Sequence, residues 1–211
     1  MKIYKIRTNP NYRRVTLSPR KFSDSKEFVQ YIKTHLKFKG VPIKGWQVPD
    51  VKADYPAFPA PDFWSVFGGI GGCGAFAAGP KAVGFVEVLL AKAGQLLPLP
   101  FQGEELTICN VLECQDCIDE DKSEWYVRRP SGERGYITRP FFLPDEVPGS
   151  NIFKIPQVID DIYTWEVDGN PEDEFKACVE ANGLTGLYFE PVWSDEEGII
   201  PYKLIEYPPS E

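Results

Sequence analysis

The chain has 211 residues, of which 43% are hydrophobic and 26% are charged, and its formal net charge is −8. These values are typical of a soluble globular protein that is large enough to bury a core without disulfide bonds. Nucleic-acid binding needs clustered basic residues that neutralise phosphates, so the acidic balance argues against a nucleic-acid partner. The sequence contains no run of about 18 apolar residues and therefore predicts no membrane span.

The N-terminal segment and the cysteine content bear on the cellular compartment. The segment MKIYKIRTNPNYRR alternates polar and apolar residues and lacks the apolar block of a signal peptide. The chain has five cysteines, an odd number. We therefore expect a cytoplasmic protein whose thiols are reduced.

Residues 1–60 are expected to form an N-terminal strand–helix subdomain with a proline-rich connector. Alternation predicts strands at residues 2–7 and 13–17. Asp24 suits the N-cap of a helix, with Glu27 completing a capping box. Residues 40–62 are too rich in proline for a helix or a central strand and are expected to run over the surface. The aromatic residues of this segment that we expect to pack on the core are Trp46, Tyr55 and Phe58.

Residues 61–211 are expected to form the main domain. A glycine-rich loop precedes a helix that begins at Pro80 and ends before Gly94. A further helix is predicted between Asn170, as its N-cap, and Gly183. The predicted strands span residues 105–114, 124–129, 136–143, 151–155, 186–193 and 199–206. The sequence thus predicts an α+β fold, with a mostly antiparallel sheet and about three helices.

Six short motifs of this main domain occur in a characteristic order. They are PDFW (Pro61–Trp64), LLPL (Leu96–Leu99), ICNVLE (Ile108–Glu113), IDEDKSE (Ile118–Glu124), NIFKIP (Asn151–Pro156) and FKACVEANGLTGLYFEPVW (Phe175–Trp193). Their order resembles immunity protein family eleven, whose members are the partners of toxins in bacterial polymorphic toxin systems. The resemblance covers residues of about 60–195. It implies a protein that binds and neutralises a cognate toxin without catalysis and without a cofactor.

The resemblance does not identify the toxin-binding residues, so the candidates come from charge and residue type. The densest acidic cluster lies at residues 116–124, and an acidic surface attracts the basic face that many nuclease toxins carry. A solvated turn is the simpler interpretation of this cluster. Large aromatic side chains commonly anchor interfaces, and Trp46 is one exposed candidate. The proposed partner-binding residues are Asp116, Asp119, Glu120, Asp121, Glu124, Trp64 and Trp193.

The cysteines allow an alternative interpretation as a metal- or iron–sulfur-binding protein. Cys109, Cys114 and Cys117 have the C-x4-C-x2-C spacing of plant-type iron–sulfur proteins, and Cys178 is a candidate fourth ligand. The segment ICNVLECQDC, however, contains the β-branched and large apolar residues of a strand. Buried thiols are therefore the favoured interpretation.

Motifs for catalysis are weak in this sequence. Gly69–Gly74 matches G-x-G-x-x-G, but Pro80 delays the helix that a dinucleotide site needs. His35 is the only histidine and falls on the apolar face of the first predicted helix, where a place at the core edge is favoured over a catalytic role. An enzyme that uses the carboxylates of residues 116–124 is the third interpretation. We expect no enzymatic activity.

Overall fold

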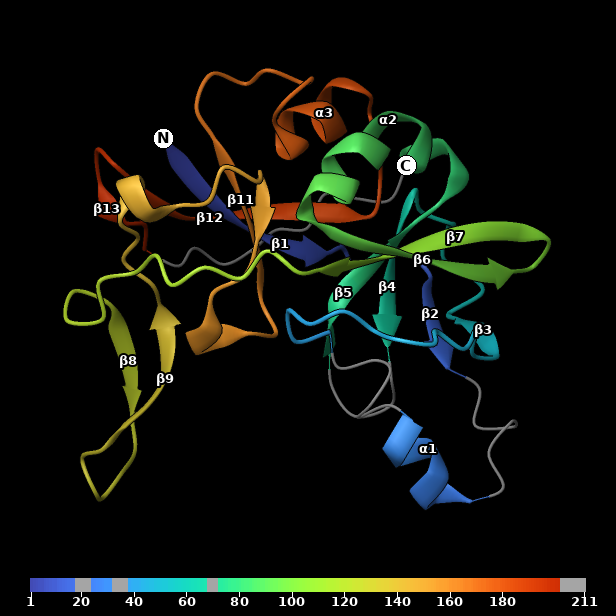
Figure 1. The fold of residues 1–211 in the computed structure, drawn as a ribbon, viewed down its shortest axis with the longest axis horizontal. Helices are drawn as coiled ribbons and strands as arrows, with labels where there is room; N and C mark the ends of the chain where they lie inside the picture. The colour runs from blue at the N-terminus through green and yellow to red at the C-terminus, as the bar shows by residue number, and fades with distance from the viewer. Residues whose placement is uncertain (18–23, 32–37, 68–71, 202–211) are drawn as a thin grey trace.

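The computed structural model of the protein describes residues 1–17, 24–31, 38–67 and 72–201, and it has an α+β fold, as predicted (Figure 1). The five-stranded sheet has the order β10 (Ile152–Phe153), β11 (Ile162–Glu166), β1 (Lys2–Thr8), β12 (Leu187–Ser194) and β13 (Gly198–Ile199). The six-stranded sheet has the order β3 (Val51–Asp54), β2 (Arg14–Leu17), β4 (Phe63–Phe67), β5 (Gly72–Ala78), β7 (Glu104–Val111) and β6 (Gly94–Phe101). Of the strand pairs with a described register, only β2 and β4 run parallel.

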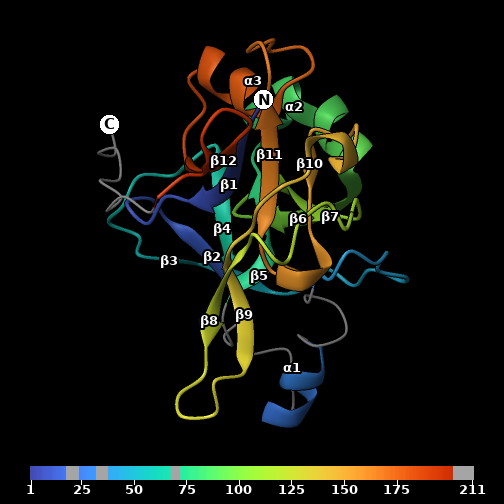
Figure 2. The same cartoon turned by 90° about the vertical axis from the view of Figure 1, so that its left-hand side faces the viewer.

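The remaining elements are helices and one separate hairpin. The helices are α1 (Ser25–Tyr31), α2 (Pro80–Ala93) and α3 (Phe175–Ala181), with short 3-10 turns η3 (Pro144–Glu146) and η4 (Pro156–Val158). The hairpin consists of β8 (Glu124–Val127) and β9 (Arg134–Arg139). Figures 1 and 2 show α2 and α3 together on one side of the molecule, with the hairpin projecting from the opposite side.

Local signals placed two of the three helices correctly. The carboxylate of Asp24 accepts hydrogen bonds from the backbone N–H groups of Lys26 and Glu27, which confirms Asp24 as the N-cap of α1. Helix α2 begins at Pro80 and ends at Ala93, as its proline and glycine signals predict. His35 and the other residues predicted to extend the first helix beyond residue 31 lie outside the described residues.

The predicted start of α3 at Pro171 is wrong. Residues 171–173 form a turn, and the helix begins at Phe175. Glu174, which precedes the helix, is buried and accepts hydrogen bonds from the N–H groups of Val167, Asp168 and Gly169. The buried carboxylate therefore organises the preceding loop, and the helix starts only after it.

Five strands occur where the sequence predicted loops or no element. Strands β4 and β5 occupy much of the region interpreted as a glycine-rich loop, and β3 lies inside the proline-rich segment. Strands β6 and β11 were not predicted. The prolines of β6 are tolerated because this strand lies at the edge of its sheet and pairs only with β7. The end of the last predicted strand, residues 202–206, falls outside the described residues.

Strand β1 lies in the middle of the five-stranded sheet, which corrects the predicted domain boundary. It pairs antiparallel with both β11 and β12, so residues 2–8 are hydrogen-bonded to segments near the other end of the chain. Strands β2 and β3 join the six-stranded sheet instead. Residues 1–60 are thus divided between the two sheets and do not form a subdomain that packs as a unit against residues 61–211.

Three clusters of buried side chains fill the fold. The first lies between α2, α3 and the two sheets and includes Phe63, Phe76 and Phe175. The second involves strands of the six-stranded sheet and the segment around Phe38 and Ile43. The third lies against the five-stranded sheet and includes Phe142, Phe153, Tyr163 and Trp193. Tyr55 and Phe58, expected to pack on the core, are exposed, and their rings stack on each other at 5.7 Å.

Several of the family-like motifs contact one another inside the fold. The carboxylate of Asp62, in PDFW, accepts hydrogen bonds from the backbone N–H and the hydroxyl of Thr185, in GLTG, at 2.8 and 2.9 Å. Gly186 has a φ of +95°. A Cβ there would lie 2.1 Å from the carbonyl oxygen of Phe63. These motif residues therefore join the start of β4 to the start of β12.

Candidate interaction surface and cavity

Residues 124–139, which we call the arm, form the β8–β9 hairpin and its connecting turn (Figure 2). The two strands are antiparallel and make a two-stranded sheet of their own. Trp125 lies opposite Ile137, and both side chains pack against the third core cluster. The base of the arm is therefore anchored in the core while its outer part projects.

The other face of the arm carries a stacked pair of tyrosines. Because side chains alternate along a strand, Tyr126 and Tyr136 lie on the face opposite Trp125 and Ile137. The tyrosine rings are 5.1 Å apart with an interplanar angle of 14°. They are 48% and 61% exposed. Stacking holds the two rings in place, so a partner that covers them has little side-chain entropy to remove.

The arm is basic although the whole chain is acidic. It contains four arginines and two glutamates, a net charge of +2, whereas the chain carries −8. Arg128 and Arg129, near the tip, are exposed. The guanidinium group of Arg134 lies over the ring of Trp125 at 5.5 Å from its centroid. The arm thus combines arginine and tyrosine, two residue types that dominate protein-binding hot spots.

The predicted acidic cluster lies at the base of the arm and is largely compensated. Ion pairs join Asp119 to Lys122 at 3.0 Å, Asp121 to Arg134 at 3.6 Å and Glu124 to Arg139 at 3.1 Å. The side-chain amide of Gln157 donates hydrogen bonds to Asp116 and Glu120. The hydrogen bond with Lys122 also lowers the pKa of Asp119. Each of the five carboxylates therefore has a cation or the Gln157 amide as a partner.

The two predicted tryptophan anchors are not exposed. Trp64 is 5% exposed and packs against Phe101, and Trp193 is 2% exposed and packs against Phe141 and Phe142. The expectation that these side chains are available to a partner is therefore wrong. Trp46 is half-buried, and its indole N–H donates to the carbonyl of Pro98 at 2.9 Å.

Sequence reasoning missed the tyrosines because it concentrated on charge and tryptophan. The segments EWYV and RGYITR both alternate, and in each the tyrosine has the opposite parity to the residue that enters the core. That alternation was visible in the sequence. Which of the two faces is covered depends on the third core cluster, and the alternation alone does not reveal that cluster.

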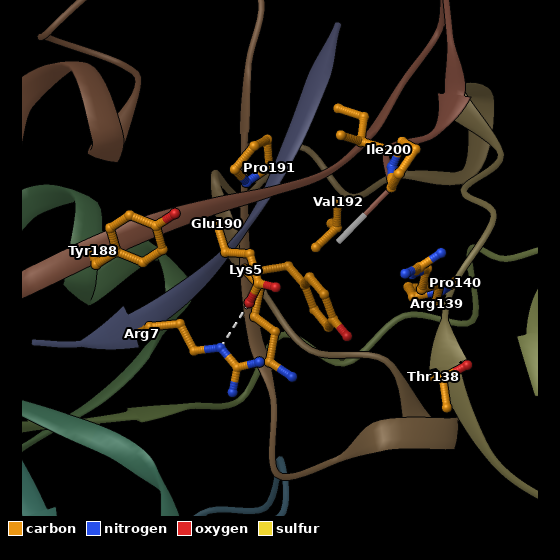
Figure 3. A pocket seen from close by; sticks show the side chains of 12 residues that line it. Lys5, Arg7, Thr138, Arg139, Pro140, Tyr188, Glu190, Pro191, Val192 and Ile200 are labelled. Atoms are coloured by element: carbon orange, nitrogen blue, oxygen red, sulfur yellow. Dashed lines mark hydrogen bonds and ion pairs between the residues drawn. The ribbon is translucent and has the colours of Figure 1, made fainter. Parts of the chain in front are cut away.

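A cavity of about 150 Å³ lies beside the arm (Figure 3). Its lining residues come from β1, β9, β11, β12 and the residues that follow β9 and β13. Figure 3 shows Arg7 and Tyr188 on one side, Thr138 and Arg139 on the other, and Lys5 and Glu190 between them. Arg139 therefore belongs both to the arm and to the cavity wall.

Ion pairs hold most of the charged groups around this cavity. Arg7 donates to Glu190 at 2.8 Å, and Lys5 pairs with Asp161, which lies outside the lining. Tyr163 is fully buried among the lining residues, and burial is the main cause that raises its pKa well above the usual value. Among the described residues that line the cavity, the charged side chains of Lys5, Arg7, Arg139 and Glu190 all belong to ion pairs.

The cysteines of the metal-binding alternative are divided among different environments. Cys109 and Cys178 belong to the first core cluster, Cys117 belongs to the third, and Cys114 is half-buried. Burial raises the pKa of both Cys109 and Cys117 to about 12, which disfavours the thiolate form that metals need. Within the described ranges, no three His, Cys, Asp or Glu residues are grouped so that they could hold a metal ion.

The glycine-rich motif also lacks the context of a nucleotide site. A dinucleotide fingerprint requires a helix that begins inside the motif. Here Gly72 and Gly74 lie in strand β5, and residues 69–71 fall outside the described residues. The segment that follows the motif is thus a strand, and α2 begins only at Pro80.

Comparisons with known proteins add no relative: no protein-family model and no curated protein sequence matches this chain. The family resemblance therefore rests on the order of the motifs in the sequence. Among the helices that the structure describes, none is both long and apolar enough to cross a membrane.

Proposed function

We propose that this protein binds and neutralises a cognate toxin of a bacterial polymorphic toxin system, without catalysis and without a cofactor. The observation that carries the proposal is the arm, which presents the stacked and exposed Tyr126–Tyr136 pair next to arginines. The motif resemblance to immunity protein family eleven supplies the class of partner. In this proposal the protein acts in the cytoplasm of the cell that it protects.

The arm has the physical properties that such a contact needs. A stable complex buries roughly 1,600 Å² in total, and a few tyrosine, tryptophan and arginine side chains supply most of the free energy of binding. The arm projects from the rest of the molecule (Figures 1 and 2). Trp125 and Ile137 fix its base in the core. An arm that is ordered before binding loses little entropy when it is captured.

The test is a binding measurement with the toxin domain encoded beside this protein. We expect a one-to-one complex of nanomolar affinity by calorimetry, together with protection of cells that express the toxin. Replacing both Tyr126 and Tyr136 by alanine should weaken binding at least about 30-fold, because each ring is a candidate hot spot. The exposed rings are not part of the core, so the thermal unfolding midpoint should change little.

The chain offers a matched control in its second exposed aromatic pair. Tyr55 and Phe58 are 51% and 41% exposed and are also stacked. Replacing both by alanine should leave toxin affinity within about twofold of wild type. Equal losses of toxin affinity in the two double variants would show that the arm is not the specific binding surface. No binding by the wild-type protein at micromolar concentration would overturn the proposed function.

A nucleic-acid partner is the competing outcome, because stacked tyrosines with arginines also suit single-stranded nucleic acid. Fluorescence anisotropy with a labelled single-stranded 20-mer decides between the two. We expect no saturable binding at physiological salt, in keeping with the net charge of −8. Saturable binding that the tyrosine double variant abolishes would replace the toxin proposal.

A further inference from the structure

The outer edge of strand β8 has no neighbouring strand. The arm is a two-stranded sheet, so each of its strands has one edge that the other strand does not cover. The 3-10 turn η4 lies against β9, whereas Figure 1 shows β8 on the outer side of the arm, away from the two larger sheets. Open strand edges present unpaired N–H and C=O groups that can pair with a further strand. As far as the structure describes the chain, β8 has the more open edge of the two.

Strand β8 also lacks the features that usually protect an edge. Its sequence, EWYV, contains no lysine and no proline. The register of the arm is irregular, but the extra residues lie in β9. Two residues separate Ile137 from Arg134, and they oppose the single residue between Trp125 and Val127. Strand β8 therefore keeps the regular alternation that pairing with a further strand requires.

Hydrogen bonds of the arm show which backbone groups lie at this edge. The N–H of Arg128 donates to the carbonyl of Glu133 at 3.0 Å. The carbonyl of Glu124 accepts a hydrogen bond from a hydroxyl on β9. Both residues thus turn backbone groups toward β9, and because this direction alternates along a strand, Trp125 and Val127 turn theirs outward. Neither has a backbone hydrogen bond to a described residue outside the arm.

A second copy of β8 fits this edge in one register that also matches charge. In an antiparallel pair, outward-facing residues must lie opposite outward-facing residues. A twofold axis at Tyr126 meets this condition, because Trp125 then lies opposite Val127 of the second copy. The same register places Glu124 opposite Arg128 of the second copy, twice by symmetry. An axis moved to either neighbouring residue keeps the backbone pairing but loses both of these charge pairs.

The side chains of the edge are available for this contact. Arg128 is exposed and forms no ion pair with any described residue. Glu124 pairs with Arg139, but its side chain is 52% exposed and can accept a second cation. Opposite charges that lie directly across two strands stabilise the pair. Val127 is 50% exposed, and Trp125 of the second copy would cover it.

We infer that two copies of this protein associate through the outer edges of β8, antiparallel about a twofold axis at Tyr126. The pairing joins the two arms into one four-stranded sheet. It uses the edge of the arm, so the face with Tyr126 and Tyr136 stays open to a partner. The inference goes beyond the proposed function and does not depend on it. The paired segment is short compared with a standard interface, so we expect a dissociation constant on the order of 10 μM.

Sedimentation equilibrium from about 1 to 300 μM tests the association. We expect a monomer–dimer equilibrium. Arg128→Glu places a carboxylate opposite Glu124 on both sides of the axis and should weaken the dimer at least about 10-fold. The matched control is Arg129→Glu, the same change at an exposed arginine that lies beyond the paired residues, which should stay within about threefold of wild type. Equal weakening by both variants would indicate a general charge effect and would overturn the inference.

An exchange of charges tests the register itself. Glu124→Arg should also weaken self-association, because it places two arginines across each pair. A mixture of Glu124→Arg and Arg128→Glu restores both opposite-charge pairs in the mixed dimer, which should form with an affinity near that of wild type. Both variants remain negatively charged overall, so a general attraction between them would not explain a mixed dimer. A mixture that stays monomeric would rule out this register and with it the inference.

Amide hydrogen exchange locates the contact at the edge. Exchange at the N–H groups of Trp125 and Val127 should slow as protein concentration rises, whereas the N–H of Tyr126 already faces β9 and should not respond. A dimer without this protection, or a wild-type protein that is monomeric at about 300 μM, would contradict the inference. Toxin binding by such a monomer would leave the proposed function intact. An edge-paired dimer that fails to bind the toxin domain would overturn only the proposed function.

Discussion

Lys154 is a fully buried lysine whose ammonium group connects three segments of the chain. It donates hydrogen bonds to the backbone carbonyls of Phe38, Gly74 and Ile159, the last two at 2.8 and 3.1 Å. The acceptors belong to the segment after α1, to strand β5 and to the residues that follow η4. A single buried side chain thus supplies a hydrogen-bond donor to backbone carbonyls of three separate segments.

Replacing Lys154 by methionine should lower the free energy of unfolding by about 3 kcal/mol or more, since each unsatisfied buried carbonyl costs about 1–3 kcal/mol. The loss should also depend on pH. Burial is the main cause that lowers the pKa of Lys154 from 10.5 to about 8, against the opposing effect of Asp160. Between these values the unfolded chain binds a proton that the folded chain has released, so the contribution of Lys154 to stability rises with pH.

The measurement is urea unfolding of the wild-type and Lys154→Met proteins from pH 7 to pH 10. The difference between the two free energies of unfolding should widen above about pH 8. The exposed Lys92→Met variant is the control and should stay within about 0.5 kcal/mol of wild type throughout. A difference that stays constant with pH would show that Lys154 remains charged in the folded state.

At the scale of single elements, sequence signals worked where the determinants were local. Pro80 and Gly94 bound α2, and Asp24 caps α1 through its own side chain. Gly183, with a φ of +56°, follows α3 as predicted. The start of α3 was predicted too early because Asn170 and Pro171 have the residue types of a helix start. In the structure the Glu174 carboxylate accepts three hydrogen bonds from backbone N–H groups of the preceding loop, and the helix begins after it.

Glu174→Gln should destabilise this loop and α3. A carboxylate has two acceptor oxygens that together receive hydrogen bonds from Val167, Asp168 and Gly169. A glutamine amide has one, so its NH₂ group would face at least one of these donors. We expect a loss of about 1–3 kcal/mol in the free energy of unfolding. Faster hydrogen exchange should appear first at residues 167–181.

The control for this variant is Glu172→Gln, which makes the same chemical change two residues away. Glu172 is exposed, and its backbone N–H donates a hydrogen bond to the side-chain oxygen of Asn170. Its replacement should change the free energy of unfolding by less than about 0.5 kcal/mol. Similar losses in both variants would point to a general effect of negative charge near the start of α3 and would contradict the role of the Glu174 carboxylate in organising the preceding loop.

The candidate site was predicted only in part, for reasons that lie in tertiary structure. The acidic residues of the turn were recognised, but the partners of Asp121 and Glu124 are arginines that come close only when β9 folds back on β8. Trp64 and Trp193 were assigned to the surface because residue type alone does not say which side of a strand faces the core. The cavity joins residues from both halves of the chain and has no local signal.

At the scale of the whole molecule, the position of β1 shows why local sequence features do not predict how segments are grouped into domains. A proline-rich stretch after residue 40 looks like a linker, and the alternation in residues 2–7 fits a strand in any sheet. Only the pairing shows that β1 is held between β11 and β12. Its side chains Ile3, Tyr4 and Ile6 are buried, so β1 completes two of the three core clusters.

Residues 61–211 expressed alone should therefore fail to fold, although they contain every motif of the family resemblance. Without β1, the strands β11 and β12 lose their shared partner and expose unpaired backbone edges. We expect weak near-ultraviolet circular dichroism and no cooperative unfolding transition for this fragment. The control replaces α1, which projects from the sheets in Figure 1, by a glycine–serine linker in the full chain and should keep cooperative unfolding. Cooperative unfolding of the 61–211 fragment would show that residues 1–60 form a separable subdomain.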